Sequence, residues 1–200
     1  LEYKLTDDLT VTSRMGFKTY SDKGKTFSPI ANYGAGKVFN TDRSTVNQSK
    51  NQYDSYTWDT FATYKKSIAD KHNFEATVGT TVIKNWGDGL FATGFDVPNN
   101  SWDFADIALT TGTSDAKENG SYTYDNRLLS YFGRLQYDFK GKYLLSAMIR
   151  RDGSSAFAKD NRIDYFKSVT AGWKISDENF LKDSEVIDFL KIRGSYGTLG

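Results

Sequence analysis

The sequence predicts an all-β fold, a segment of an antiparallel transmembrane β-barrel with about seven or eight strands in the chain. Three observations predict it. Apolar and polar residues alternate at every second position, which is the period of a strand with one apolar side. The connections between these segments alternate between short and long, as they do in outer-membrane barrels. Aromatic residues make up 16% of the chain and gather near the expected strand ends.

The composition excludes several other classes of protein. The chain has no cysteine and one histidine, so disulfide scaffolds and thiolate or histidine-rich metal sites are excluded. Its formal net charge of +1 provides no field that would attract nucleic acid. No run approaches the length of about 18 apolar residues that a transmembrane helix needs. The first residues carry no signal peptide, and we therefore expect a mature chain or a piece of one.

The expected strands follow one another along the chain. Residues 1–5 form a partial strand, and residues 9–19 alternate as Leu, Val, Ser, Met, Phe and Thr on one side. Residues 56–64 and 74–82 repeat the pattern with aromatic and β-branched residues. The contrast is sharp at 129–139, where the odd positions read Leu, Tyr, Gly, Leu, Tyr and Phe. Further strands are expected at 143–150, 165–175 and 190–197.

The connections differ in length. Short turns are expected at 5–9, 66–71 and 140–142, and a polar connection at 176–189. Long connections are expected at about 21–51, 84–127 and 151–164, and we predict that these three are external, because barrel loops on the cell surface are the long ones. Period alone leaves an alternative open: a soluble or surface-anchored β-sandwich, used for adhesion or binding, whose apolar faces meet in a core.

The alternation gives the strands two faces, one lipid-facing and one lumen-facing. The predicted lipid-facing residues are Leu129, Tyr131, Leu135, Tyr137, Val169, Ala171 and Trp173. The predicted lumen-facing residues are Arg14, Lys18, Asp59, Lys65, Glu75, Arg134, Gln136, Asp138, Lys174, Lys191 and Arg193. Tyr137, Phe139 and Tyr143 around the 140–142 turn mark one of two expected aromatic belts.

No catalytic motif is present. The sequence contains no nucleophile elbow, no H-E-x-x-H and no phosphate-binding glycine loop. The pairs Asp7–Asp8 and Asp103–Asp106 are expected to be solvated turn formers, and His72 an exposed turn residue. We therefore predict that the protein is not an enzyme, with no catalytic residue, no metal site and no cofactor.

Aromatic residues in the longest expected connection are candidates for binding a ligand or a partner. They are Trp86 and Trp102, the latter followed by Asp103 and Phe104. Exposed indole rings can anchor a protein interface or stack on sugar rings. The alternative is that each ring anchors its own loop.

The last third of the chain resembles a known family. Its blocks are LLSYFGR at 128–134, YLLSA at 143–147, RRDGSS at 150–155, YFKSVTAGWKIS at 165–176 and FLKIRGSYG at 189–197. In this order they resemble the barrel of SusC/RagA-like TonB-linked outer-membrane transporters of the Bacteroidetes. Lys167 stands where the family usually has proline, and Ala156 where it usually has a basic residue.

The resemblance implies a complete barrel of about 22 strands with an N-terminal plug domain. It also implies coupling to the TonB complex and a SusD-like surface lipoprotein, for import of oligosaccharides or peptides across the bacterial outer membrane. The plug domain is absent from this chain, so we expect residues 1–200 to be part of one transmembrane barrel domain and an internal segment of a longer transporter. The transported substrate stays open.

Overall fold

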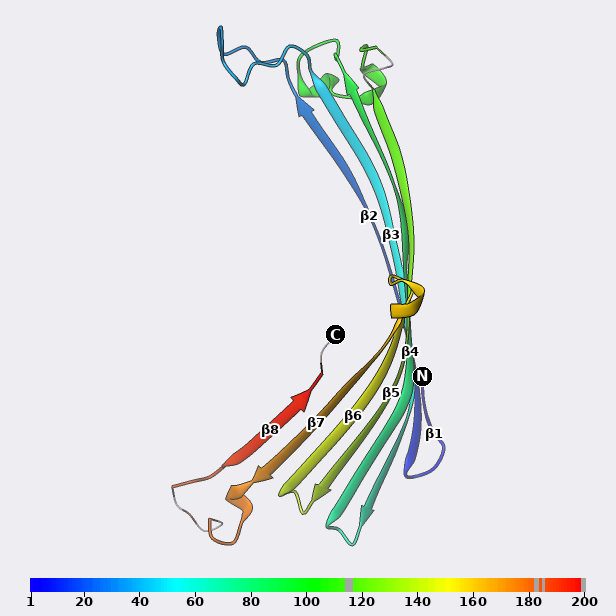
Figure 1. Cartoon of the computed structure of the whole chain (residues 1–200), viewed down its shortest axis with the longest axis vertical. Helices are drawn as coiled ribbons and strands as arrows, with labels where there is room; N and C mark the ends of the chain where they lie inside the picture. The colour runs from blue at the N-terminus through cyan, green and yellow to red at the C-terminus, as the bar shows by residue number, and fades with distance from the viewer. Residues whose placement is uncertain (114–116, 182–183, 185, 199–200) are drawn as a thin grey trace. The chain divides into compact units, whose positions relative to one another are not determined.

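The computed structural model describes residues 1–113, 117–181, 184 and 186–198, and within them one eight-stranded antiparallel sheet (Figure 1). The strands are β1 (Glu2–Lys4), β2 (Leu9–Ser28), β3 (Thr45–Ile68), β4 (His72–Phe95), β5 (Glu118–Phe139), β6 (Tyr143–Ser154), β7 (Ile163–Lys174) and β8 (Lys191–Gly197). Each strand pairs with the next one along the chain. None of the described helices is long and apolar enough to cross a membrane. The predicted all-β class and strand number are confirmed.

The two shortest strand connections are tight turns. In the β3–β4 turn, Ala69 and Asp70 have φ angles of 54° and 52°. In the β5–β6 turn, Lys140 and Gly141 have φ angles of 54° and 69°. Two central residues with positive φ are typical of the type I′ turn, whose twist matches the twist of the flanking strands. The sequence predicted short turns at both places.

Strands β2 to β5 are longer than predicted. They contain 20, 24, 24 and 22 residues, whereas roughly 9 to 11 residues cross a bilayer. Much of the ranges 21–51 and 84–127 is therefore strand, and the remaining connections are residues 29–44 and 96–117, of which 114–116 lie outside the described residues. The third predicted connection shortens to 155–162. The apolar alternation ends before the backbone pairing does, so the periodic signal marks only part of each strand.

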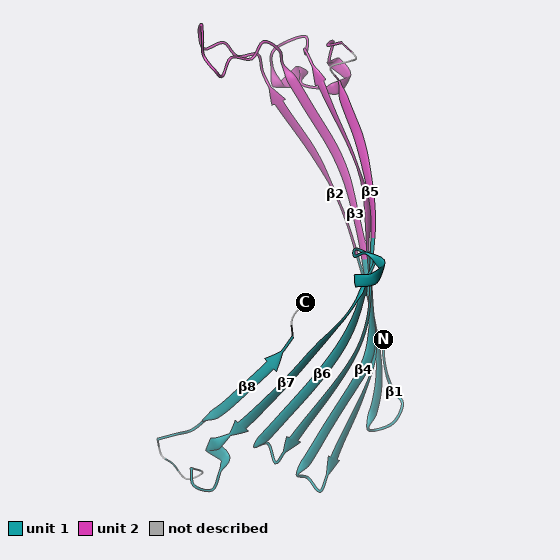
Figure 2. Cartoon of the chain, viewed as in Figure 1, with its two compact units in different colours: residues 1–17, 56–84, 126–200 teal, residues 18–55, 85–125 magenta. Residues whose placement is uncertain are grey.

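The chain divides into two compact units, and β2 to β5 contribute residues to both (Figure 2). The first unit comprises Leu1–Phe17, Tyr56–Lys84 and Asn126–Gly200, and the second comprises Lys18–Ser55 and Asn85–Asp125. The boundary in β2 and β3 falls where the apolar alternation of the sequence stops. The first unit therefore carries the strand segments that the sequence predicts to cross a membrane.

One face of the first unit is apolar. This outer face carries Leu135, Tyr137, Leu145, Ala147, Val169 and Ala171, which lie in register across β5, β6 and β7. Leu135 is 64% exposed and Val169 is 50% exposed. Only Val46, Ala105 and Ile175 are buried apolar residues among those described, and the described strands form one sheet. The structure thus contradicts the β-sandwich alternative, because a sandwich buries its apolar faces between two sheets.

An arginine at the centre of the outer face should impair membrane insertion. In the full-length protein, Leu135→Arg places a charge where we expect lipid, at a cost of about 2 to 4 kcal/mol. Gln136→Arg is the matched control, because the next residue of a strand points to the opposite face. Urea unfolding in lipid vesicles and the yield of folded barrel in the membrane measure both effects. Equal tolerance of the two variants would contradict the lipid-facing assignment.

Candidate functional site

The opposite face of the first unit is polar, and we call it the inner face. Gln136 of β5 lies opposite Ser146 of β6, and Arg134 and Asp138 share its side of the strand. Through the β6–β7 and β7–β8 registers, Arg193 lies in the same row as Asp138. Four residues predicted to face the lumen therefore share one face.

The charges of the inner face are paired across neighbouring strands. Lys65 Nζ lies 3.1 Å from Glu75 Oε2, which joins β3 to β4. The amide of Gln136, in the orientation that its neighbours require, donates to Glu75 at 3.2 Å and accepts from Arg134 at 3.3 Å. Exposed ion pairs of this kind add little stability. Their effect is a wall of mixed charge that suits a hydrated surface.

The other predicted lumen residues lie in different surroundings. The guanidinium of Arg14 lies 5.2 Å from the ring centre of Phe61 on β3. Lys18 belongs to the second unit, where its ammonium lies 5.4 Å from the Tyr20 ring. Lys174 forms an ion pair with Asp177 at 2.8 Å, and its ammonium therefore contacts the β7–β8 connection.

A hollow of about 660 Å³ opens on the inner face near the short turns. Its charged lining residues are Asp7, Asp8, Lys65, Lys66, Glu75, Asp138, Lys191 and Arg193. Asp8 forms an ion pair with Lys66, so it acts as the predicted polar turn residue rather than as a catalytic acid. The hollow therefore presents both signs of charge to whatever occupies the inner side.

A row of aromatic rings runs along the turn end of the outer face. The ring centres of Phe74 and Tyr137 are 4.8 Å apart. Those of Phe139 and Tyr143 are 6.1 Å apart, and those of Tyr143 and Trp173 are 6.4 Å apart. This row agrees with the aromatic belt predicted at this end, because such rings prefer the membrane–water interface.

His72 was predicted as an exposed turn residue, and that prediction is wrong. Its Nδ1 lies 2.8 Å from the Tyr137 hydroxyl, and its ring lies 4.8 Å from Phe139. The side chain is half-buried within the aromatic row. The position of His72 at the start of a strand beside Lys71 suggested exposure, but its ring contacts the aromatic row.

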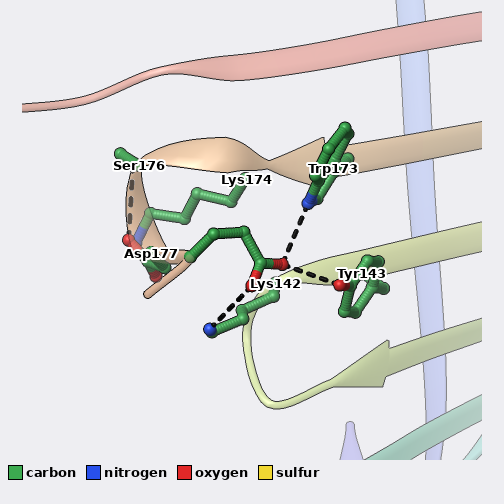
Figure 3. Close-up of polar contacts among 7 residues, drawn as sticks. Lys142, Tyr143, Trp173, Lys174, Ser176 and Asp177 are labelled. Carbon is green, nitrogen blue, oxygen red and sulfur yellow. Dashed lines mark hydrogen bonds and ion pairs between the residues drawn. The ribbon is translucent and has the colours of Figure 1, made fainter. Parts of the chain in front are cut away.

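The carboxylate of Glu178, in the β7–β8 connection, accepts three hydrogen bonds at this end (Figure 3). The Tyr143 hydroxyl donates at 2.7 Å, the Trp173 indole at 3.1 Å and the Lys142 ammonium at 3.3 Å. These donors, the Tyr143 hydroxyl first, hold the pKa of the Glu178 carboxyl below its usual range. The connection is thereby fastened to the aromatic row.

In the second unit, tyrosines gather over glycines. Tyr20 stacks on Tyr53 with ring centres 4.6 Å apart, and the hydroxyls of Tyr53 and Tyr122 are 3.3 Å apart. A Cβ at Gly89 would lie 2.4 Å from the Tyr122 ring, and one at Gly87 would lie 2.3 Å from a backbone carbonyl of β3. Sequence analysis missed this cluster, although glycines and tyrosines at every second position were its signal.

The predicted binding residues of the second unit lie in two places. Trp102, Asp103 and Phe104 form one short helical turn, Trp102–Phe104, in the connection between β4 and β5. Trp102 is 55% exposed, and the Lys25 ammonium lies 4.8 Å from its ring centre. Trp86 was predicted in a loop, but it lies inside β4. The structure thus separates Trp86 from the exposed turn.

Asp106 serves as a helix cap in the same connection. Its carboxylate accepts a hydrogen bond from the Ala108 backbone amide at 2.9 Å and from Gln48 at 3.3 Å. The backbone donor first, and then Gln48, lower the pKa of this carboxyl. A capping carboxylate of lowered pKa is a poor general acid at neutral pH. No cluster of residues that could hold a metal occurs within the described ranges.

Comparison with known proteins gives the family. No family model matches the chain. A TonB-dependent receptor of Formosa agariphila is 30% identical over 202 residues, which cover 100% of this chain and 19% of that receptor. The TonB-dependent receptor SusC of Bacteroides thetaiotaomicron is 46% identical over 101 residues, which cover 50% of this chain and 10% of SusC. The chain belongs to the SusC/RagA-like TonB-dependent transporters.

A solved structure shares the fold of this SusC/RagA-like chain. The structure of the RagAB peptide transporter aligns with a TM-score of 0.80 and 22% identity, over 98% of this chain and 21% of that one. The sheet is therefore a barrel segment of the kind found in that transporter. This SusC/RagA-like chain spans about a fifth of the length of the relatives that match it throughout.

Removing the charge of Glu178 should change acid sensitivity. The Glu178 carboxyl has a lowered pKa in the folded state, so its ionised form stabilises the folded protein. This contribution is fully present above the ordinary carboxyl pKa of about 4.3 and is lost as the pH falls through the lower folded-state pKa. In the full-length transporter, the unfolding temperature should drop less between pH 7 and about pH 3.5 for Glu178→Gln than for the wild type. Asp188→Asn, an exposed acid of the same connection, is the control. An unchanged acid sensitivity in Glu178→Gln would exclude this role.

Proposed function

We propose that this chain is a barrel segment of a transporter that imports oligosaccharides or peptides across the bacterial outer membrane, driven by TonB. One observation carries the proposal: a TonB-dependent receptor matches the whole chain at 30% identity. The uncovered apolar outer face and the polar inner face support it, because a barrel wall needs lipid on one side and water on the other. The protein is a transporter and not an enzyme.

The short turns lie in the periplasm, and the connections 29–44 and 96–117 lie outside the cell. The lengths of the connections support this orientation, because barrels of this kind have short turns in the periplasm and longer loops outside the cell. The β3–β4 and β5–β6 connections are tight turns, whereas 29–44 and 96–117 are much longer. Beyond the apolar part, β2 to β5 continue into the second unit.

The external connections bind a SusD-like surface lipoprotein and contact the substrate. The Trp102–Phe104 turn is the candidate, because it combines exposed aromatic rings with the Asp103 carboxylate. Aromatic anchors with a polar rim are common in interfaces. The RagAB structure is that of a peptide transporter, which supports a peptide as one substrate class. The TonB complex acts through parts of the transporter outside this chain.

Loss of the exposed indole at Trp102 should weaken uptake or lipoprotein binding. In the full-length transporter, Trp102→Ala should lower one of the two by about tenfold or more, because buried aromatic anchors contribute about 2 kcal/mol to an interface. Phe180→Ala removes an aromatic side chain that is 70% exposed in the β7–β8 connection and is the matched control. Growth on the cognate nutrient and co-purification of the lipoprotein are the measurements. Wild-type growth together with wild-type lipoprotein co-purification would show that Trp102 has only a structural role in its own loop.

Cysteine labelling tests the orientation. Ala35→Cys lies in the 29–44 connection and Lys71→Cys at the β3–β4 turn, and both positions are exposed. On intact cells, a membrane-impermeant maleimide should label the Ala35 variant at least about tenfold more than the Lys71 variant, since the outer membrane shields the periplasmic turn. Permeabilised cells should label both equally. Stronger labelling of the Lys71 variant on intact cells would reverse the topology.

A further inference from the structure

Two cations lie on the outer face at the end away from the β5–β6 turn. Arg151 of β6 lies opposite Tyr131 of β5 and Tyr165 of β7, and Lys167 lies opposite Ile149. The guanidinium of Arg151 lies 5.9 Å from the ring centre of Tyr131. Neither cation forms an ion pair with any residue that the structure describes.

The adjacent arginine on the inner face behaves differently. Arg150 donates to Asp152 at 2.7 Å and to Ser130 at 2.9 Å. Acidic partners therefore occur on the inner side of these strands, whereas the outer-face positions of β6 and β7 carry no acid within the described residues. Cations at the edge of an apolar membrane-facing surface attract anionic lipid headgroups. Arg151 and Lys167 thus lie at diagonal positions of adjacent strands, on a face where the described residues of β6 and β7 include no acid.

An apolar hollow of about 450 Å³ begins beside Lys167. Its outer-face lining is Ala76, Val78, Gly133, Leu135, Ala147, Ile149 and Val169. Gly133 leaves space at its centre, since an added Cβ would lie 3.9 Å from Ile149 and 4.0 Å from Val78. Arg151 lies two residues along β6 from Ile149, which is about 7 Å. A phosphate on the cations and an alkyl chain in the hollow can therefore belong to one molecule.

We propose that this surface binds a phosphorylated glycolipid of the outer leaflet, with its phosphate between Arg151 and Lys167 and one acyl chain in the hollow at Gly133. The inference rests on the proposed function, because only that orientation places Arg151 and Lys167 in the outer leaflet. Guanidinium and ammonium groups form short, charge-assisted hydrogen bonds with phosphate oxygens. Tyr131 and Tyr165, each about half exposed, flank the pair as interfacial aromatic residues do. The glycolipid is chosen over a phospholipid because the outer leaflet of such membranes consists of phosphorylated glycolipid.

The test measures lipid binding to the purified full-length transporter by native mass spectrometry. The probes are bis-phosphorylated lipid A, dephosphorylated lipid A and phosphatidylglycerol. Arg151→Gln/Lys167→Gln should bind lipid A about 30-fold more weakly than the wild type, which corresponds to about 1 kcal/mol for each removed charge. Lys71→Gln/Lys140→Gln removes two charges at the opposite end of the strands and should bind as the wild type does. Gly133→Leu fills the hollow and should also weaken binding.

Several results would overturn the inference. They are equal lipid A binding by the wild type and Arg151→Gln/Lys167→Gln, equal binding by Gly133→Leu, and equal affinity of the wild type for phosphatidylglycerol or dephosphorylated lipid A. The yield of folded barrel is measured for each variant, so that loss of folding is separated from loss of binding. Cysteine labelling separates the two proposals. Reversed labelling contradicts the proposed function, whereas expected labelling without lipid A binding contradicts this inference alone.

Discussion

No residue that the structure describes covers the apolar outer face, and the arrangement of the first unit follows from this. Leu135 and Val169 are at least half exposed, and the described strands form a single sheet that has no second layer. In water such a surface would drive association. In lipid the face is stable, but each backbone N–H and C=O group then needs a partner within the protein. Strand-to-strand pairing provides those partners, and type I′ turns continue it from one strand to the next.

The strand register that forms the apolar outer face also determines the polar inner face. Because side chains alternate along a strand, a slip of one residue would exchange the two faces. Leu135 opposite Ala147 therefore also sets Gln136 opposite Ser146. The inner contacts, such as Lys65 with Glu75, add little stability, since both side chains are substantially exposed. In the proposed barrel these residues form a hydrated wall, and stability there would come from strand pairing and from contact of the outer face with lipid.

Sequence alone predicted what depends on local periodicity. The alternation at 129–139 predicted this part of β5 and which of its residues share a side of the strand, and Lys-Gly-Lys at 140–142 predicted its turn. The parts of β2 to β5 that belong to the second unit were missed because apolar and polar residues do not alternate regularly there, so no two-residue period marks them. The tyrosine cluster was missed for another reason. Tyr53 and Tyr122 are 69 residues apart, and only the strand register brings them together.

That cluster explains how neighbouring strands of the second unit are held together. In the second unit, a Cβ at Gly87 would collide with a β3 carbonyl, so glycine allows close backbone approach, and aromatic rings from β5 cover the bare strand. Aromatic residues packed over glycines on a neighbouring strand stabilise such pairs. Tyrosine is suited to this position because its ring packs while its hydroxyl remains available for hydrogen bonds. The Trp102–Phe104 turn, which we propose binds a partner, is therefore connected to ordered strands, and a binding surface on an ordered support loses less entropy when a partner binds.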